Sequence, residues 1–242
     1  MPEPFLSIVV PAYNEARRIR GTLEQVCRFR ASKPYAVELI VVDDGSTDQT
    51  LQTVAEFPGI RLVRNDRNHG KGYTVRHGVL EAAGKFALFT DADLSTPIEE
   101  ADKLISALQS HGADVAIGSR ALRRELIGIR QPWLRDAGGR FFNLFVRAFT
   151  GLRLHDTQCG FKLFNRSSTR RAFEKLRIEG FGFDPELLFL IKNGGGKILE
   201  VPVRWNDNPA TKVRFMRDSA EMVMDLVSIR WRSLMGMYRE RD

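Results

Sequence analysis

Short, nearly continuous apolar runs alternate with amphipathic segments through the first half of the chain. The runs Leu6–Val10 and Val37–Val42 are typical of strands that are buried on both faces of a sheet. Three further runs predict strands at Ile60–Val63, Phe86–Thr90 and Asp114–Ile117. Between these runs, apolar residues recur every three or four positions, as in Ile19–Cys27, and this spacing predicts helices. The alternation favours an α/β fold with a mainly parallel sheet and helices on both faces.

The second half of the chain has a less regular pattern. Asp184–Lys192 predicts a helix and Ile198–Val203 predicts a strand, whereas the charged segment Leu122–Trp133 predicts a loop. The sequence contains no internal repeat and no linker composition that would divide it. We therefore expect one large domain over residues 1–218, followed by a C-terminal amphipathic helix over residues 219–242.

Two segments, Arg135–Gly151 and Ser219–Tyr238, pair a wide apolar stripe with arginines. This pairing is typical of helices that lie in a membrane surface, and it predicts peripheral contact with a membrane. The same kind of stripe also suits a helix that packs against a protein core. The pattern alone leaves both interpretations open.

Composition limits the class of protein. The chain has 242 residues, of which 43% are hydrophobic, and this is enough for one large domain. Two cysteines do not make a disulfide framework, so we expect a reducing, cytoplasmic setting. No signal-peptide pattern is present, and no run approaches the ~18 apolar residues of a membrane span. We therefore expect a protein at the cytoplasmic face of a membrane.

The net charge of +7 is spread unevenly along the chain. Between Arg120 and Arg153 there are eight arginines and only two acidic residues. Such clusters favour phosphates, anionic lipid surfaces or nucleic acid, and they also occur as solvated basic faces. Because the sequence contains no recognisable nucleic-acid-binding module, we expect no nucleic-acid partner.

Two predicted strands end in aspartates. Leu39–Val42 runs into Asp43. Phe86–Phe89 is followed closely by Asp91 and Asp93, which point to the same side if the strand geometry continues. In an open α/β sheet, ligands bind outside the carboxyl ends of the strands. Two hard oxygen donors there suit Mg²⁺ or Mn²⁺, which in turn suits a diphosphate.

Walker A and Rossmann glycine motifs are absent, but six other motifs follow one another along the chain: Val9–Glu15, Val42–Asp48, Asn68–Gly72, Asp91–Asp93, Gly118–Arg120 and Asp156–Phe164. Together, and in this order, they resemble the motifs of the inverting family 2 glycosyltransferases. The later ones are similar to the branch that transfers a sugar to a polyprenyl (dolichyl) phosphate, and Thr157–Lys162 is more similar to its glucosyl than to its mannosyl members. The resemblance covers about Leu6–Lys212 and implies a GT-A-like, Rossmann-type fold.

The resemblance also implies a role for each matching position. Contacts to the nucleotide-sugar are implied for Pro11, Tyr13, Glu15, Asp43, Lys71, Asp91 and Ala92. The implied metal ligands are Asp91 and Asp93, with Ser95 where mannosyl relatives often have a glutamine, so no third ligand is implied. Roles in catalysis are implied for Asp93, Arg120, Asp156 and Gln158, and contacts to the acceptor phosphate for Arg120, Lys162 and Lys212.

The implied reaction moves a hexose, glucose from UDP-glucose by the glucosyl similarity, to a polyprenyl phosphate with the help of Mg²⁺ or Mn²⁺. A phosphate monoester has a second pKa of ~6, so this acceptor needs cations to position it more than a base to deprotonate it. One displacement on the sugar carbon inverts its configuration. The sequence leaves open the use of GDP-mannose, a soluble or glycan acceptor, and non-catalytic binding of a nucleotide-sugar. The intact Asp91–Asp93 motif speaks against the last of these.

Overall fold

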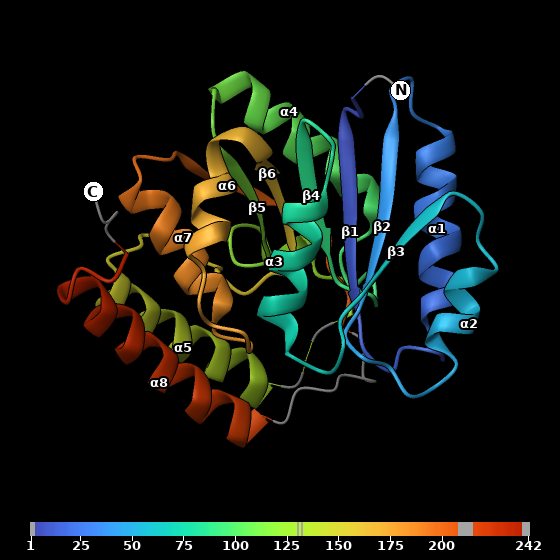
Figure 1. Cartoon of the computed structure of the whole chain (residues 1–242). Helices are drawn as coiled ribbons and strands as arrows, with labels where there is room; N and C mark the ends of the chain where they lie inside the picture. Colours follow the sequence, from blue (N-terminus) through green and yellow to red (C-terminus); the bar gives the residue numbers. More distant parts are fainter. Residues whose placement is uncertain (1–2, 130, 132, 208–214, 239–242) are drawn as a thin grey trace.

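Seven strands form one sheet in the computed structural model, which describes residues 3–129, 131, 133–207 and 215–238 (Figure 1). The strands are β1 (Leu6–Ala12), β2 (Val37–Asp43), β3 (Ile60–Arg64), β4 (Phe86–Thr90), β5 (Val115–Ser119), β6 (Phe161–Asn165) and β7 (Ile198–Pro202). The α-helices are α1 (Ile19–Ala31), α2 (Thr50–Ala55), α3 (Lys71–Glu81), α4 (Ala101–His111), α5 (Trp133–Thr150), α6 (Arg166–Lys175), α7 (Phe183–Asn193) and α8 (Phe215–Leu234). Two 3₁₀ helices, η1 (Ile98–Glu100) and η2 (Arg124–Leu126), precede α4 and α5.

The strand order in the sheet is β3-β2-β1-β4-β6-β5-β7. Four neighbouring pairs are parallel, whereas β6 runs antiparallel to both of its neighbours, β4 and β5. The predicted mainly parallel sheet is confirmed, with β6 as the exception. Because β6 is reversed, its first residue, Phe161, lies opposite Thr90 at the carboxyl end of β4. The loop before β6 therefore reaches the same edge of the sheet as the aspartates that follow β4.

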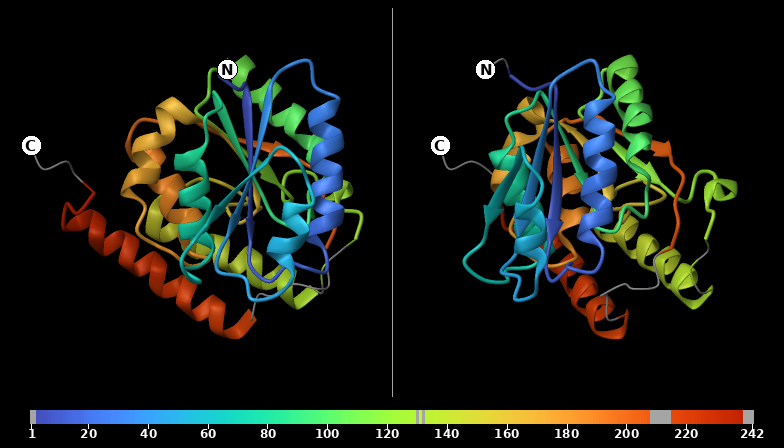
Figure 2. Two further views of the ribbon diagram at one scale, coloured as in Figure 1. Left: turned by 45° about the vertical axis from the view of Figure 1, so that its right-hand side comes forward. Right: turned by 90° about the vertical axis from the view of Figure 1, so that its right-hand side faces the viewer.

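Helices cover both faces of the sheet, as predicted (Figure 2). Along β1, Ile8 and Val10 point to the face covered by α1 and α4, whereas Val9 points to the opposite face. That opposite face is covered by α3, α6 and α7. Because every central strand is buried on two sides, its sequence is apolar at successive positions rather than at alternate ones.

Two elements of the second half, β6 and α6, have no counterpart among the predictions from sequence. In β6, a lysine and an asparagine interrupt the apolar run, and in α6 only Thr169, Ala172 and Phe173 are buried. The segment predicted as a loop, Leu122–Trp133, contains η2. Helix α8 begins at Phe215, ahead of the predicted start at residue 219.

Helices α5 and α8 lie side by side at one border of the molecule (Figure 1). Their inner sides join the core through Val146, Leu226 and Ile229, which are buried. Their outer sides expose large apolar side chains that we call the α5–α8 apolar surface: Trp133, Phe141, Leu144, Met224, Val227, Trp231 and Leu234. Each helix thus packs inward and also presents apolar residues outward. Within the described part of the chain, every helix is too short or too polar to cross a bilayer.

Candidate active site

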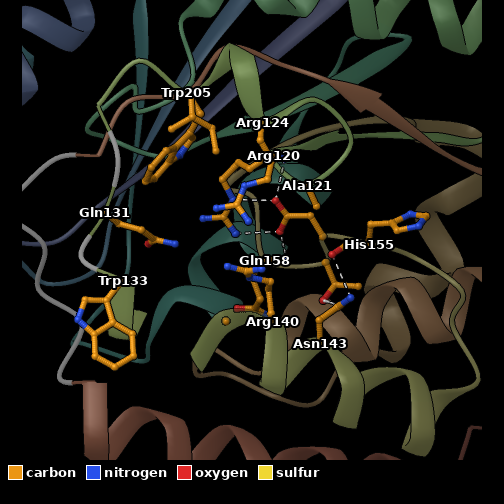
Figure 3. Close-up of a pocket in the computed structure, with 14 residues that line it drawn as sticks. Arg120, Ala121, Arg124, Gln131, Trp133, Arg140, Asn143, His155, Gln158 and Trp205 are labelled. Carbon is orange, nitrogen blue, oxygen red and sulfur yellow. Dashed lines mark hydrogen bonds and ion pairs between the residues drawn. The ribbon is translucent and has the colours of Figure 1, made fainter. Parts of the chain in front are cut away.

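Two cavities open at the edge of the sheet where β1, β2, β4 and β5 end. The first cavity has a volume of 380 Å³ and is lined mostly by the first half of the chain. Of the residues predicted to contact the nucleotide-sugar, Pro11, Tyr13, Glu15, Lys71, Asp91 and Ala92 line it, together with Asp93. The second cavity, of 480 Å³, is lined by Arg120, Asp156 and Gln158 among others (Figure 3). The structure therefore separates the predicted site residues into two neighbouring groups.

Asp91 joins the end of β4 to the loop before β6. Its backbone N–H donates to the carbonyl of Gly160 at 3.1 Å. Its carboxylate lies directly over Gly160, where an added Cβ would overlap with Oδ2, so this close approach requires a glycine. Lys71, at the start of α3, forms an ion pair with Asp91 at 2.7 Å. Burial by itself would lower the pKa of Lys71, but the carboxylates of Asp91, Asp184 and Asp93 together outweigh burial and raise it, so the ammonium group stays charged.

Asp93 lies just beyond Asp91, and its Oδ1 accepts a hydrogen bond from the Ser95 N–H at 3.0 Å. Its Oδ2 faces Arg18, whose Nη1 lies 3.7 Å away. Arg18 in turn makes two hydrogen bonds to the carboxylate of Glu15. Glu15 therefore both lines this cavity and positions Arg18, a residue that the sequence pattern does not single out.

The two aspartates fit a divalent cation. They line the same cavity, and the side chains of Asp91 and Asp93 remain 33% and 18% exposed. Among the described residues, no group of three or more His, Cys, Asp and Glu side chains is arranged to hold a metal ion. The protein thus offers two carboxylates, and Mg²⁺ commonly takes its other oxygen ligands from water and from substrate phosphates.

The two carboxylates that follow β2 have different surroundings. Asp44 accepts hydrogen bonds from Asn65 and from the backbone N–H groups of His69–Gly70. Asp43 accepts one from the Ser46 N–H, and its Oδ1 is buried without a partner among the described residues. A buried, unpaired carboxylate oxygen suits a ligand that donates a hydrogen bond. Asp44 thus lines the first cavity with its hydrogen bonds already made, whereas Asp43 is fully buried and does not line that cavity, although its Oδ1 has no partner among the described residues.

Arg120 and Asp156 form an ion pair in the second cavity (Figure 3). Arg120 Nε and Nη2 donate to the two carboxylate oxygens at 2.7 and 2.8 Å, and the Arg120 N–H adds a third hydrogen bond. The guanidinium also lies 5.3 Å from the ring centre of Trp205. Burial by itself would raise the pKa of Asp156, but Arg120 outweighs burial and lowers it. Asp156 therefore stays ionised and fixes the position of Arg120.

Gln158 is a second polar group of this cavity, and its buried Nε2 has no partner among the described residues. An unpaired amide N–H is a donor available to a ligand. Arg124 and Arg140 also line the cavity, as does Trp133, which belongs to the α5–α8 apolar surface. The second cavity thus connects a basic interior with that apolar surface.

The structure places Lys162 behind the second cavity rather than in it. Its side chain is buried, and its ammonium group pairs with Asp184 at 2.7 Å and donates to the Cys159 carbonyl. Direct contact with an acceptor phosphate, which the resemblance implies, does not fit this position. Lys162 instead supports the loop before β6. Lys212 lies outside the described residues.

The loop that links α6 to α7 brings a residue of the second half to the first cavity. Phe181 lines that cavity, 5.9 Å from the Lys71 ammonium as measured to the ring centre. The Glu179 carbonyl accepts hydrogen bonds from the N–H groups of Gly72 and Tyr73, so this loop packs on the start of α3. Sequence spacing carries no signal for such a residue because the loop has no periodic pattern.

The same loop is held from its other side by α8. Glu186, which is buried in α7, accepts hydrogen bonds from the backbone of Arg177–Ile178. Its second carboxylate oxygen accepts hydrogen bonds from Arg232 of α8 at 3.3 Å and from Tyr238 at 2.5 Å. We call this set of contacts the Glu186 junction, and it links α8 to the loop that borders the first cavity.

An α/β sheet with carboxylates and basic residues at its carboxyl edge is in keeping with a glycosyltransferase, and the comparisons with known proteins show that class. Residues 7–173 match the family described as glycosyl transferase family 2, so the chain belongs to that family and the predicted resemblance is confirmed. The chain is 36% identical to the dolichyl-phosphate beta-glucosyltransferase of Saccharomyces cerevisiae, over 98% of this chain and 78% of the relative. It is also 36% identical to the Drosophila melanogaster protein of the same name, with the same coverage of both chains.

Solved structures show the same fold at lower identity. Glucosyl-3-phosphoglycerate synthase from Mycobacterium tuberculosis, in complex with Mn²⁺, UDP and glucosyl-3-phosphoglycerate, superimposes with a TM-score of 0.71 and 20% identity. The match covers 94% of this chain and 80% of the synthase. This likeness confirms the predicted GT-A-like fold.

Proposed function

We propose that this glycosyltransferase moves glucose from UDP-glucose to the phosphate of a polyprenyl phosphate such as dolichyl phosphate, using Mg²⁺ or Mn²⁺. The observation that carries the proposal is the contact of Asp91 with Gly160. It joins the carboxylate-lined first cavity to the loop that contributes Asp156 and Gln158 to the second cavity. The names of the yeast and fly relatives support glucose as the sugar and dolichyl phosphate as the acceptor.

In the first cavity, Asp91 and Asp93 would hold the divalent cation, which when bound stabilises negative charge on the leaving diphosphate. The unpaired Oδ1 of Asp43 would accept a hydrogen bond from the base. Pro11 and Tyr13 line the same cavity and would contact the nucleotide with their apolar surfaces. The mycobacterial synthase, which has the same fold, binds Mn²⁺ and UDP, and this supports a divalent cation and a nucleoside diphosphate as ligands.

In the second cavity, Arg120 would position the acceptor phosphate, and Gln158 would donate a hydrogen bond to it. The acceptor is largely ionised at neutral pH, so it can attack the sugar carbon without a general base. His155 also lines the cavity, but its Nδ1 lies 2.8 Å from Glu200, so this ring is already engaged. A single attack from the second cavity on a sugar held in the first inverts the sugar configuration.

The test is release of nucleoside diphosphate from several nucleotide-sugars, with and without a polyprenyl phosphate. We expect release of UDP from UDP-glucose that depends on the polyprenyl phosphate, and little release when the neutral polyprenol replaces it, because arginine contacts select charge. Equal rates with the phosphate and the alcohol would refute the proposed acceptor. Faster turnover of GDP-mannose would correct the donor and leave the acceptor in place.

We also propose that the α5–α8 apolar surface contacts the cytoplasmic face of a membrane. A polyprenyl chain resides in the bilayer, and the second cavity opens toward this surface through Trp133. Exposed arginines of both helices, including Arg140, Arg147 and Arg230, accompany the apolar side chains. Near an anionic membrane each such arginine contributes about 1 kcal/mol to binding. The free cysteines Cys27 and Cys159 are in keeping with a reducing compartment.

Co-sedimentation with anionic and neutral liposomes across a salt series tests this contact. We expect salt-sensitive binding of the full chain to anionic liposomes, and a loss of it in the variant Trp231→Ser/Leu234→Ser. Leu62→Ser, which changes an exposed leucine on the distant strand β3, is the matched control. If the full chain does not sediment at low salt, the proposed membrane contact is wrong.

A further inference from the structure

Each carboxylate of the Asp91–Asp93 motif already has a basic partner inside the first cavity. The Lys71 ammonium lies 2.7 Å from Asp91 Oδ1, and Arg18 Nη1 lies 3.7 Å from Asp93 Oδ2. The two cations come from different elements, the start of α3 and the turn before α1. They face the same oxygens that a divalent cation would need.

The position of Lys71 is fixed by its neighbours along the chain. Gly70 has a φ of 107°, and an added Cβ there would meet the Glu179 carbonyl at 2.6 Å. Gly72 is equally close to the backbone of the same loop, and its N–H donates to Glu179. Two glycines thus let the first turn of α3 approach this loop, and Lys71 between them is directed at Asp91.

Arg18 is held in a different way. Its guanidinium makes two hydrogen bonds to Glu15, and the Glu15 N–H donates to Thr50 Oγ1 at 2.7 Å. The positive charge of Arg18 is therefore partly neutralised by Glu15. Because of this second partner and the longer distance to Asp93, Arg18 holds its aspartate less tightly than Lys71 holds Asp91.

We propose that Lys71 and Arg18 are resident counter-ions, which neutralise Asp91 and Asp93 in the nucleotide-free enzyme and pass to the donor diphosphate when it binds, releasing both carboxylates for the metal. This inference rests on the proposed function, since it needs a diphosphate donor and a divalent cation. According to this inference, the two basic residues compete with the metal for the carboxylates and also contact the phosphates.

The physical basis is competition for the same carboxylate oxygens. A lysine in direct contact with Asp91 opposes the approach of a divalent cation, by repulsion and by occupying an oxygen. A bound diphosphate gives Lys71 and Arg18 a new anionic partner. Their opposition to metal binding therefore falls when the nucleotide binds. Metal and nucleotide then strengthen each other's binding, and this coupling is equal in both directions. Removing Lys71 should therefore strengthen metal binding to the free protein and weaken the coupling.

The experiment measures binding of Mn²⁺ by the electron paramagnetic resonance signal of the free ion, with and without UDP and without any acceptor. We expect Lys71→Met to bind Mn²⁺ about tenfold more tightly than wild type in the absence of UDP, a change typical of coupling between sites. UDP should then improve Mn²⁺ binding by Lys71→Met less than it does for wild type. Arg18→Met should show a smaller change in the same direction.

Two further variants serve as controls. Lys33→Met removes a lysine that lies outside both cavities and pairs with Asp102 at a distance of 2.6 Å. This variant should bind Mn²⁺ as wild type does. Lys71→Arg keeps the charge and should keep the weak binding of Mn²⁺ to the free protein. If Lys71→Met fails to fold, Arg18→Met carries the test, and an unchanged or weaker Mn²⁺ affinity in that variant would overturn the inference. Thermal melting identifies such a folding failure.

The outcomes separate this inference from the proposed function. If wild type binds Mn²⁺ with UDP and Lys71→Met leaves the affinity of the free protein unchanged or weaker, the counter-ion inference is wrong and the proposed metal site stands. Mn²⁺ affinity that rises equally in Lys33→Met and Lys71→Met would also overturn it, since the effect would then be one of net charge. If wild type binds no Mn²⁺ even with UDP, the metal site and the inference both fail.

Discussion

In the first cavity, carboxylates face lysine and arginine side chains that reach in from separate elements, whereas in the second Arg120 is fixed by Asp156. The Lys71–Asp91 pair is 24% and 33% exposed, and the Arg120–Asp156 pair is 25% and 7% exposed. Asp156 makes three hydrogen bonds to Arg120, so that pair is built into the fold. The pairs of the first cavity each rest on fewer contacts.

Ion pairs therefore have a different role in each of the two cavities. A buried ion pair that loses one partner leaves an uncompensated charge, which is strongly unfavourable, so such a pair holds a geometry. A pair that stays open to solvent contributes little to stability, and its members exchange partners readily. We therefore expect substitutions in the first cavity to change ligand binding and those in the second to change stability as well.

The largest expected effect is on turnover, in the variant Asp93→Asn. Loss of a metal ligand should cost several kcal/mol of transition-state stabilisation, about a thousandfold in rate. The melting temperature should stay near that of wild type, because Asp93 is partly exposed and pairs with Arg18 only at 3.7 Å. The measurements are UDP release and thermal melting. If the variant keeps the wild-type rate in the presence of EDTA, the proposed metal role of the first cavity is wrong.

Arg120→Ala should affect both the fold and the reaction. It leaves Asp156 buried without its partner, which typically costs about 3–5 kcal/mol of the free energy of unfolding. The double variant Arg120→Ala/Asp156→Ala should recover part of this stability but not the activity. Denaturant unfolding and UDP release measure the two effects separately. If Arg120→Ala is as stable as wild type, the ion pair of the second cavity does not stabilise the fold, and the proposed difference between the cavities is wrong.

Gly160→Ala tests the contact that joins the cavities. An added Cβ would overlap with the Asp91 carboxylate and displace it, so we expect turnover to fall by about 10- to 100-fold, as for the loss of a supporting contact at a metal site. Gly21→Ala is the matched control, because a Cβ at that position of α1 meets nothing within 4 Å and lies outside both cavities. The kinetic constants of both variants, with saturating metal, provide the measurement. Equal rates in the two variants would show that the cavities are independent.

The smallest effect concerns Asp225 of α8, which packs against Gly182 beside the loop that borders the first cavity. Burial, together with the nearby Glu186, raises the pKa of Asp225 to about 6 from its usual 3.8. The folded protein therefore prefers the protonated form, and its stability falls as the pH rises from about 4 to 6. Asp225→Asn should raise the melting temperature at pH 8 by about 2–4 °C, which corresponds to about 1 kcal/mol in a chain of this size. The gain should vanish near pH 4, and a gain that is independent of pH would rule out this cause.

The sequence predicts the first cavity better than the second, for physical reasons. Continuous apolar runs mark β1, β2 and β4, and the aspartates that follow β2 and β4 must lie at one edge of a parallel sheet. Arg120 and Asp156 are 36 positions apart, so no local pattern shows that they pair. Lys162 appears available for a phosphate until the structure brings Asp184 beside it. Long-range pairing, which composition and spacing do not encode, accounts for most of what the sequence leaves undetermined.

The Glu186 junction means that α8 is not an independent attachment to the catalytic domain. The Glu186 carboxylate is shared by Arg232 of α8 and the backbone of Arg177–Ile178, so we expect a tilt of α8 to move the loop that packs on the start of α3. A detergent that binds α8 would therefore change the KM for the nucleotide-sugar before any lipid acceptor is present. Comparing that KM across detergents of increasing chain length would use donor binding as a gauge of helix orientation.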